Sequence, residues 1–200
     1  MSARRAPPIF GLLLAGGASR RMRCDKARVC YGGEPQLTRA WRLLEAVTTQ
    51  AFVSVRAEQR DDPLRAGLAQ IVDRYEAIGP AAGILSAQAT HPDVAWLVIA
   101  CDLPLLNEAT LRRLVDARDA AGDATAFASS CDAMPEPLCA LWEPSSHALL
   151  KRQVDEGRHC PRKALMQSRT KLLPAPGDAL DNINTPEEFQ RMQHRIEAQP

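Results

Sequence analysis

A dense group of cationic side chains follows two glycines in the segment LLLAGGASRRMRCDKA, residues 12–27. Glycines after an apolar run let the backbone approach a ligand closely and turn N–H groups toward it. Arginine and lysine side chains add charge-assisted hydrogen bonds to phosphate oxygens. The cations concerned are Arg20, Arg21, Arg23, Lys26 and Arg28. The segment fits a phosphate site, and taken by its spacing alone it fits a solvated basic turn equally well.

Two widespread phosphate loops are missing from the sequence. No glycine is followed by lysine, so the G-x-x-x-x-G-K-[ST] loop of many kinases and NTPases is absent. The G-x-G-x-x-G fingerprint of dinucleotide-binding proteins does not occur either. The kinase-like and dinucleotide interpretations therefore lose the support of their motifs.

A second candidate for chemistry is Asp102, which ends the long apolar run AWLVIACDLP. A carboxylate there is costly unless it is solvated, hydrogen-bonded or paired with a cation. Mg²⁺ takes hard oxygen ligands and often only one or two carboxylates together with phosphates. A turn or capping role before Pro104 is the structural alternative for this aspartate. Combined with the basic glycine loop, Asp102 indicates metal-assisted chemistry on the phosphates of a nucleotide.

The bulk composition describes an ordinary globular protein. The 200 residues suit one domain, and a formal net charge of +1 argues against broad nucleic-acid binding. The six cysteines form no C-x-x-C pair and no zinc-like cluster with histidine, which favours reduced thiols in a cytoplasmic protein. No segment approaches the roughly 18 apolar residues of a membrane helix. The apolar run after Arg4 and Arg5 is better explained as a buried strand than as an export signal.

Strand-like apolar runs alternate with amphipathic stretches along the chain. Strands are expected at 8–14, 51–55, 70–73, 95–104, 124–129, 137–142 and 170–175. Helices are expected at 36–47, 62–69, 80–90, 107–122, 145–157, 161–168 and 185–196. The alternation predicts an α/β fold with a mostly parallel sheet covered on both faces, and ligands beyond the carboxyl ends of its strands.

Some residues are expected to shape individual helices. Asn107 is the predicted N-cap of its helix and Gly122 the predicted stop, with Arg118 at the edge of the apolar face, where it can reach water. We expect one domain over residues 1–200, with residues 1–8 as a flexible N-terminal extension.

Four ordered segments resemble the molybdenum cofactor guanylyltransferases, the MobA-type nucleotidyltransferases. The loop resembles their L-A-G-G-x-S-x-R-M-G-x-D-K signature, and GPAAGI (79–84), ACDLPLL (100–106) and NINTPEEF (182–189) follow in the family's order. The resemblance spans nearly the whole chain. It implies a single Rossmann-like, three-layer α/β/α domain and Mg²⁺-dependent transfer of GMP from GTP to molybdopterin, with release of pyrophosphate.

The resemblance also implies roles for individual residues. Lys26, Asp102 and Arg21 would be catalytic, and Asp102 would hold Mg²⁺. The nucleotide site would consist of Leu14, Ala15, Gly16, Gly17, Ser19, Lys26, Asp73, Gly83, Asp102, Asn182 and Asn184. The attacking group is already a phosphate anion, so no catalytic base is needed. The enzyme must instead position two anions and stabilise the developing charge.

Two positions depart from the family's pattern. Arg23 replaces the glycine after Arg-Met, where it either strains the loop or adds a phosphate contact. Arg56 stands near a position where the family often has a nucleotide-contacting asparagine, which leaves the base specificity open. A CTP-dependent cytidylyltransferase of the same cofactor is one alternative, although Gly17 favours guanine. A nucleotide-binding regulator with a retired active site is the other.

The partners implied are GTP and molybdopterin, and then a molybdoenzyme apoprotein or a cofactor-delivery protein. No nucleic acid and no membrane are expected to bind. The expected oligomeric state is a monomer or a weak homo-oligomer, in the cytoplasm.

Overall fold

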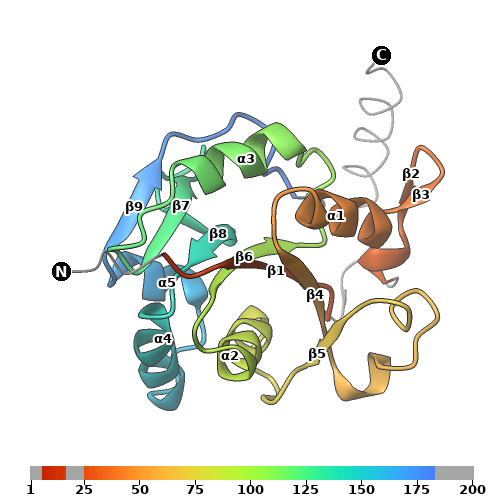
Figure 1. Ribbon diagram of the computed structural model, residues 1–200, viewed down its shortest axis with the longest axis horizontal. Coiled ribbons are helices and arrows are strands. Elements are labelled where there is room, and N and C mark those ends of the chain that lie inside the picture. Colours follow the sequence, from red (N-terminus) through yellow and green to blue (C-terminus); the bar gives the residue numbers. More distant parts are fainter. Residues whose placement is uncertain (1–5, 17–24, 183–200) are drawn as a thin grey trace.

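The computed structural model describes residues 6–16 and 25–182. In this part of the chain, a seven-stranded sheet has the order β5-β4-β1-β6-β8-β7-β9 (Figure 1). Every strand is parallel to the others except β8, which is antiparallel to both of its neighbours. The predicted mostly parallel sheet is thus confirmed. The strands are β1 (Ile9–Leu14), β4 (Gln50–Val55), β5 (Gln70–Val72), β6 (Ala95–Ala100), β7 (Ala124–Ala128), β8 (Pro135–Trp142) and β9 (Thr170–Leu173).

Helices cover both faces of the sheet, which makes three layers (Figure 1). One face packs against α1 and α3 in one apolar core, and the other packs against α2, α4 and α5 in a second core. The helices are α1 (Gln36–Glu45), α2 (Pro80–Thr90), α3 (Glu108–Asp116), α4 (Ser146–Asp155) and α5 (Pro161–Met166). Short 3₁₀ helices η1 (Lys26–Arg28) and η2 (Ala57–Gln59) and a small hairpin, β2 (Cys30–Tyr31) with β3 (Glu34–Pro35), complete the described elements.

The central strand β6 explains why the chain reads as apolar before Asp102. All six of its residues are buried, because helices cover the sheet on both sides. β1 pairs with β6 in a parallel register that sets Leu14 opposite Ala100. The backbone N–H of Cys101 then donates to the carbonyl of Leu14 at 3.1 Å. The residues that follow the two strands are therefore brought to one edge of the sheet.

The expected helix over residues 62–69 is wrong. The segment forms turns, in which the Asp62 carboxylate accepts a hydrogen bond from the backbone N–H of Leu64. A carboxylate that bonds the local backbone in this way competes with helix formation. Thr185 and the rest of the expected closing helix lie outside the described residues.

The end of α3 also differs from its prediction. Asn107 is the N-cap, as expected, but the helix ends at Asp116 rather than at Gly122. Gly122 lies against the backbone of Arg169 instead, where an added Cβ would approach the Arg169 carbonyl oxygen to 2.8 Å.

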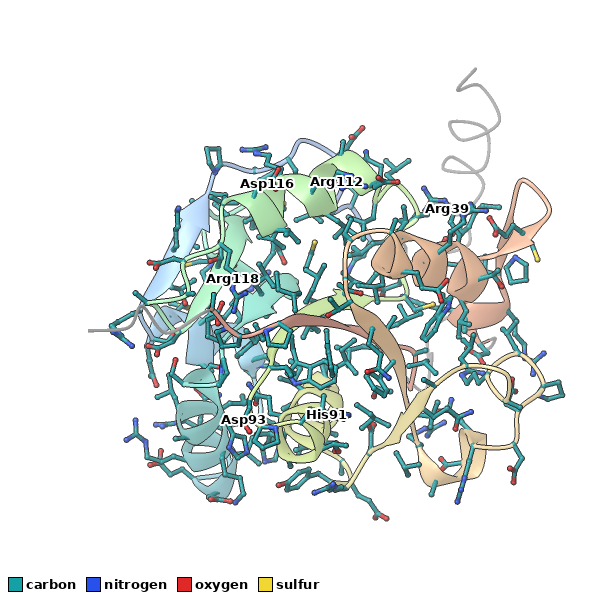
Figure 2. All side chains as sticks on the ribbon, in the orientation of Figure 1. Arg39, His91, Asp93, Arg112, Asp116 and Arg118 are labelled. Atoms are coloured by element: carbon teal, nitrogen blue, oxygen red, sulfur yellow. The ribbon has the colours of Figure 1, made fainter. Side chains whose placement is uncertain are left out.

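Arg118 does not extend into water as predicted, since only 12% of its side chain is exposed. It lies between α3 and the sheet (Figure 2) and donates from Nε and Nη2 to the buried carboxylate of Glu143 at 2.6 and 2.7 Å. Its Nη1 donates to the carbonyl of Pro7 at 2.7 Å. The carbonyl of Pro8 accepts from Ala95 N at 2.9 Å, so this part of the expected N-terminal extension is bonded to the fold.

Candidate functional site

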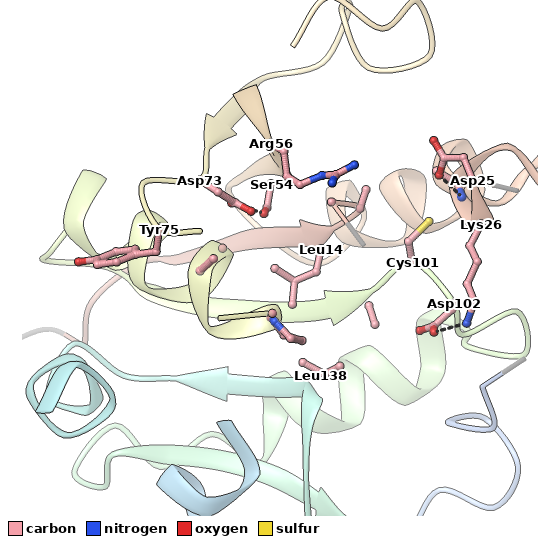
Figure 3. Close-up of a pocket in the computed structure, with 18 of the residues that line it drawn as sticks. Leu14, Asp25, Lys26, Ser54, Arg56, Asp73, Tyr75, Cys101, Asp102 and Leu138 are labelled. Atoms are coloured by element: carbon pink, nitrogen blue, oxygen red, sulfur yellow. Dashed lines mark hydrogen bonds and ion pairs between the residues drawn. The ribbon is translucent and has the colours of Figure 1, made fainter. Parts of the chain in front are cut away.

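A pocket of about 750 Å³ opens at the carboxyl ends of β1, β4, β5 and β6 (Figure 3). This is the edge where ligands bind in mostly parallel α/β sheets. Charged side chains approach the pocket from two directions. Lys26 and Asp102 lie at one end, and Ser54, Asp73 and Arg56 lie at the other.

At the first end, Lys26 Nζ donates to Asp102 Oδ2 at 2.9 Å. Asp102 is the second residue after β6, and Lys26 is the first residue of η1. Both side chains are partly exposed, at 21% for Lys26 and 26% for Asp102. Asp25 caps η1, because its Oδ1 accepts a hydrogen bond from Ala27 N at 3.0 Å. A cation and a carboxylate are thus held next to each other on the pocket wall.

At the other end, Ser54 Oγ donates to Asp73 Oδ1 at 2.7 Å. Burial raises the pKa of the Asp73 carboxyl, and the Ser54 hydrogen bond and the charge of Arg56 oppose that rise. Gly16, two residues after the end of β1, lies beside this carboxylate, since a Cβ added there would lie 3.5 Å from Asp73 Oδ2. The Asp73 carboxylate is thus a hydrogen-bond acceptor close to the end of β1, where the glycine-rich segment begins.

Arg56 stands beside this carboxylate. Its backbone N–H donates to Gln59 Oε1 at 3.1 Å, and its Nη1 lies 3.1 Å from Glu58 Oε1. The side chain is 42% exposed, so its guanidinium is held mainly by exposed partners. Ion pairs of this kind are weak, and the guanidinium can exchange its partner for a ligand.

Helix α2 approaches the pocket through its first turn. Gly79 precedes it with φ +61°, and Pro80 takes the first helical position. Gly83 packs directly on the sheet, since an added Cβ would lie 2.4 Å from Ser54 Oγ and 2.6 Å from a methyl of Leu14. The close contact between α2 and the strands therefore requires a residue without a side chain.

The sequence-predicted residues fall into two groups. The structure brings seven of them together as lining of the one pocket: Leu14, Ala15, Gly16, Lys26, Asp73, Gly83 and Asp102. Asn182 is described and exposed but does not line it. Gly17, Ser19, Arg21, Asn184 and the divergent Arg23 lie outside the described residues. The roles assigned to all of these residues stay predictions.

Several pocket residues were missed by the sequence analysis. Ser54 had a usable signal, because it is a polar residue inside the apolar run AFVSV. Tyr75, Ala77 and Leu138 carried none. Cys101 also lines the pocket, but burial raises the pKa of its thiol to about 12, with the Asp102 charge as the next cause. A thiol in that state is not a nucleophile at neutral pH.

The pocket offers few ligands for a metal ion. Among the described residues, no group of three or more His, Cys, Asp or Glu side chains could hold one. Asp102 presents a partly exposed carboxylate, and its bond to Lys26 uses one of the two oxygens. One carboxylate with nucleotide phosphates and water is a donor set that Mg²⁺ accepts. The residues present fit an ion shared with a nucleotide.

Two further observations concern the chain as a whole. No helix in the described ranges combines the length and the apolarity needed to cross a bilayer. Cys30, Cys101, Cys131, Cys139 and Cys160 are free thiols. Cys101 and Cys139 are buried, as small core residues.

Comparison with known sequences connects the pocket to a family. Residues 11–171 match the MobA-like NTP transferase domain. The chain is 36% identical over 184 residues to a molybdenum cofactor biosynthesis bifunctional protein of Synechocystis sp., covering 91% of this chain but only 53% of that protein. It is 32% identical over 187 residues to a molybdenum cofactor guanylyltransferase of Pseudomonas aeruginosa, covering 90% and 92% of the two chains.

Comparison with solved structures gives the same fold. The molybdopterin-guanine dinucleotide biosynthesis protein A from Archaeoglobus fulgidus aligns with a TM-score of 0.80 at 23% identity, covering 94% of this chain and 98% of that one. A nucleotidyl transferase from Methanothermobacter aligns with a TM-score of 0.76 at 16% identity, covering 96% and 99%. The chain described here belongs to the MobA-like NTP transferase family and is a nucleotidyltransferase.

Proposed function

We propose that this protein transfers GMP from GTP to molybdopterin, releasing pyrophosphate and forming a molybdopterin guanine dinucleotide. The observation that carries the proposal is the Lys26–Asp102 pair, which lies in the same pocket as Ala15, Gly16 and Asp73. The relatives named as molybdenum cofactor guanylyltransferases support the choice of substrates. Both substrates carry phosphate groups, and a cation beside a carboxylate suits their recognition.

The reaction is a displacement at phosphorus. The terminal phosphate of the pterin attacks the α-phosphorus of GTP, a P–O bond forms there, and the bond to the leaving pyrophosphate breaks. The nucleophile is an anion, so no side chain has to remove a proton. Catalysis then rests on alignment of two repelling anions and on stabilisation of charge in the transition state.

This chain's residues supply that alignment in our proposal. Lys26 Nζ leaves Asp102 for the phosphates, and the Ala15–Gly16 backbone lies along the nucleotide. Asp102 would hold Mg²⁺, which neutralises phosphate charge when bound. Gly17, Ser19, Arg21, Asn182 and Asn184 complete the proposed site.

The choice of guanine has a chemical basis in the other end of the pocket. The Asp73 carboxylate accepts hydrogen bonds, and the Arg56 guanidinium donates them. A guanine edge offers N1–H and N2–H donors together with O6 and N7 acceptors, so it can use both groups. Cytosine offers one amino donor beside its acceptors. The pair therefore favours GTP, although a CTP-dependent reaction uses the same mechanism.

Calorimetric titration of the purified protein with GTP, CTP and ATP, each with and without Mg²⁺, tests the proposal. We expect tightest binding of Mg-GTP, and pyrophosphate release only when molybdopterin is added. Preference for CTP would keep the mechanism and change the product. Binding of GTP without transfer would favour a regulator with a retired site. The same assays with candidate molybdoenzyme apoproteins or delivery proteins test whether the dinucleotide product is transferred to them. Analytical sedimentation tests whether the protein is the proposed monomer or weak homo-oligomer.

A further inference from the structure

Arg65 is a fully buried arginine beside the proposed nucleotide site, and no sequence motif points to it. It lies in the turns between η2 and β5, and its side chain has 0% exposure. Its Nη2 donates to the carbonyl of Ala15 at 3.1 Å and to Asp25 Oδ2 at 2.7 Å. One guanidinium thus contacts residues on both sides of the glycine-rich segment in the sequence.

These contacts lead directly to Lys26. Asp25, the N-cap of η1, uses one carboxylate oxygen for Arg65 and the other for the N–H of Ala27 within that helix. Lys26 is the next residue, and its Nζ reaches Asp102 at 2.9 Å. At the same time Arg65 holds the Ala15 carbonyl at the end of β1. Arg65 therefore links the end of β1 to the residue that precedes Lys26.

Fold stability alone does not explain this arrangement. Nε and Nη1 of Arg65 are buried without a hydrogen-bond partner, although Nη1 lies 3.2 Å from Asp62 Oδ1. A buried guanidinium whose donors are incompletely used destabilises the fold compared with a satisfied one. Arg118, which pairs with the buried Glu143, donates from Nε, Nη1 and Nη2 at 2.6–2.7 Å.

We propose that Arg65 is a positioning residue for nucleotidyl transfer. It holds the end of β1 and the start of η1 together, so that the Ala15–Gly16 backbone and Lys26 Nζ face the same phosphates. The proposal rests on the proposed function for the place of the nucleotide. It adds a residue from outside the signature loop, acting through Asp25 and Lys26 rather than by touching substrate.

The first test compares Arg65→Met with the matched control Arg118→Met. Both variants remove a largely buried guanidinium, which leaves Asp25 and Asp62 behind in one case and Glu143 in the other. Arg118, however, bonds to Glu143 and Pro7 away from the pocket. For Arg65→Met we expect kcat for pyrophosphate release to fall about 100-fold, as for small misplacements of reacting groups. The KM for the nucleotide should change less than kcat. Equal kcat losses in the two variants would overturn the proposal.

The second test separates positioning from general loosening of the fold. If Arg65 acts by placing Lys26, then Arg65→Met should reduce kcat less than about five-fold in a Lys26→Ala background, because coupled residues are not additive. A full, additive loss in that background would contradict the proposal. If either methionine variant does not fold, Arg65→Lys and Arg118→Lys are compared in place of the two methionine variants. Lysine keeps the charge but lacks the planar fork, and the same difference in kcat is expected.

A third test needs neither substrate nor activity, so it stands even if the proposed function fails. The rate of acetic-anhydride labelling of Lys26 is measured by mass spectrometry in the protein without nucleotide. Release of Lys26 from Asp102 should raise that rate in Arg65→Met and leave it unchanged in Arg118→Met. Equal rates in the two variants would overturn the positioning role, whereas an inactive wild type with the expected labelling would overturn the proposed function alone.

Discussion

The two halves of the sheet use their charged residues in different ways. Strands β5, β4, β1 and β6 are all parallel, and their carboxyl ends line the pocket together with η1, η2 and the start of α2. The half made of β8, β7 and β9 contributes a single leucine, Leu138. Charged side chains in the second half instead join its elements, as in the Arg118–Glu143 and Arg169–Asp123 pairs. Pairs that join elements also occur in the first half, as in Arg65–Asp25. The pocket, however, lies in that half apart from Leu138.

The direction of the strands accounts for this division. Parallel strands end at the same edge, so the residues that follow each of them meet there. Strand β8 is antiparallel to β6, so its carboxyl end lies at the opposite edge of the sheet. The first half also tolerates a carboxyl, Asp73, whose pKa is raised because burial disfavours its charge. Charges that destabilise the fold where a ligand would bind are typical of functional sites.

The largest expected effect belongs to Asp102→Asn in the first half. Loss of the carboxylate removes the proposed metal ligand and the partner of Lys26, so pyrophosphate release should fall about 1000-fold, as when one preorganised electrostatic group is lost. Asp93→Asn is the matched control, because exposed Asp93 precedes the same strand that Asp102 follows (Figure 2). A folded Asp102→Asn enzyme with more than a tenth of wild-type activity would contradict the functional role given to the first half of the sheet.

Gly83→Ala should have the next largest effect, this time on stability. Its Cβ would meet Ser54 Oγ at 2.4 Å and Leu14 Cδ2 at 2.6 Å, so α2 must move away from the sheet. Overpacking of this kind destabilises by about 1–3 kcal/mol. Denaturant unfolding measures the change, with Gly67→Ala as the control because an added Cβ there meets nothing within 4 Å. Equal stability of both variants would show that α2 shifts freely.

These two residues also show what the sequence could predict. Gly83 and Asp102 lie in motifs, and the elements that position them, helix α2 and strand β6, are apolar stretches that depend on local sequence alone. The order of strands and helices could therefore be predicted through most of the described chain. Local pattern also placed Asn107 correctly as an N-cap, because capping needs only residues a few positions apart.

The wrong prediction for Arg118 and the missed contacts of Arg65 share a physical cause, which is pairing over long sequence distances. Arg118 is expected at the water-exposed edge of its helix, because nothing local points to Glu143 as its partner. Arg65 carries no prediction, because nothing local points to Asp25 as its partner. The same holds for Arg39 (Figure 2), whose Nη2 donates to the carbonyl of Leu106 at 2.9 Å, and for Gln36, whose amide donates to Leu103 O at 3.2 Å. Both bonds fasten the segment after Asp102 to α1.

Asp73→Asn should separate function from stability. We expect nucleotide affinity to fall about ten-fold, as when a charged hydrogen-bond acceptor is lost. Stability at neutral pH should not fall, because the raised pKa means that the folded state holds the charged form less favourably than the unfolded state does. Titration calorimetry and urea unfolding measure the two quantities. Lower stability with unchanged affinity would assign Asp73 to the fold instead.

The smallest effect is expected for Asp123→Asn in the second half, where the sign of the pH dependence reverses. The hydrogen bond from Arg169 lowers the pKa of Asp123 to about 2, with Ser145 and the Arg169 backbone adding to it. A depressed folded-state pKa contributes stability above the unfolded value near 4, and that contribution is lost as pH falls through about 2. The wild type should therefore be slightly more stable than the variant at pH 7, and this advantage should shrink between pH 4 and pH 2.

Urea unfolding of both proteins across that range measures the difference, and transfer activity at pH 7 should be equal in the two. Asp73 and Asp123 then respond to acid in opposite directions, since protonation relieves the first and removes a favourable pair from the second. A loss of activity in Asp123→Asn without loss of stability would contradict the division, because it would place a functional charge in the half of the sheet that the pocket leaves almost untouched.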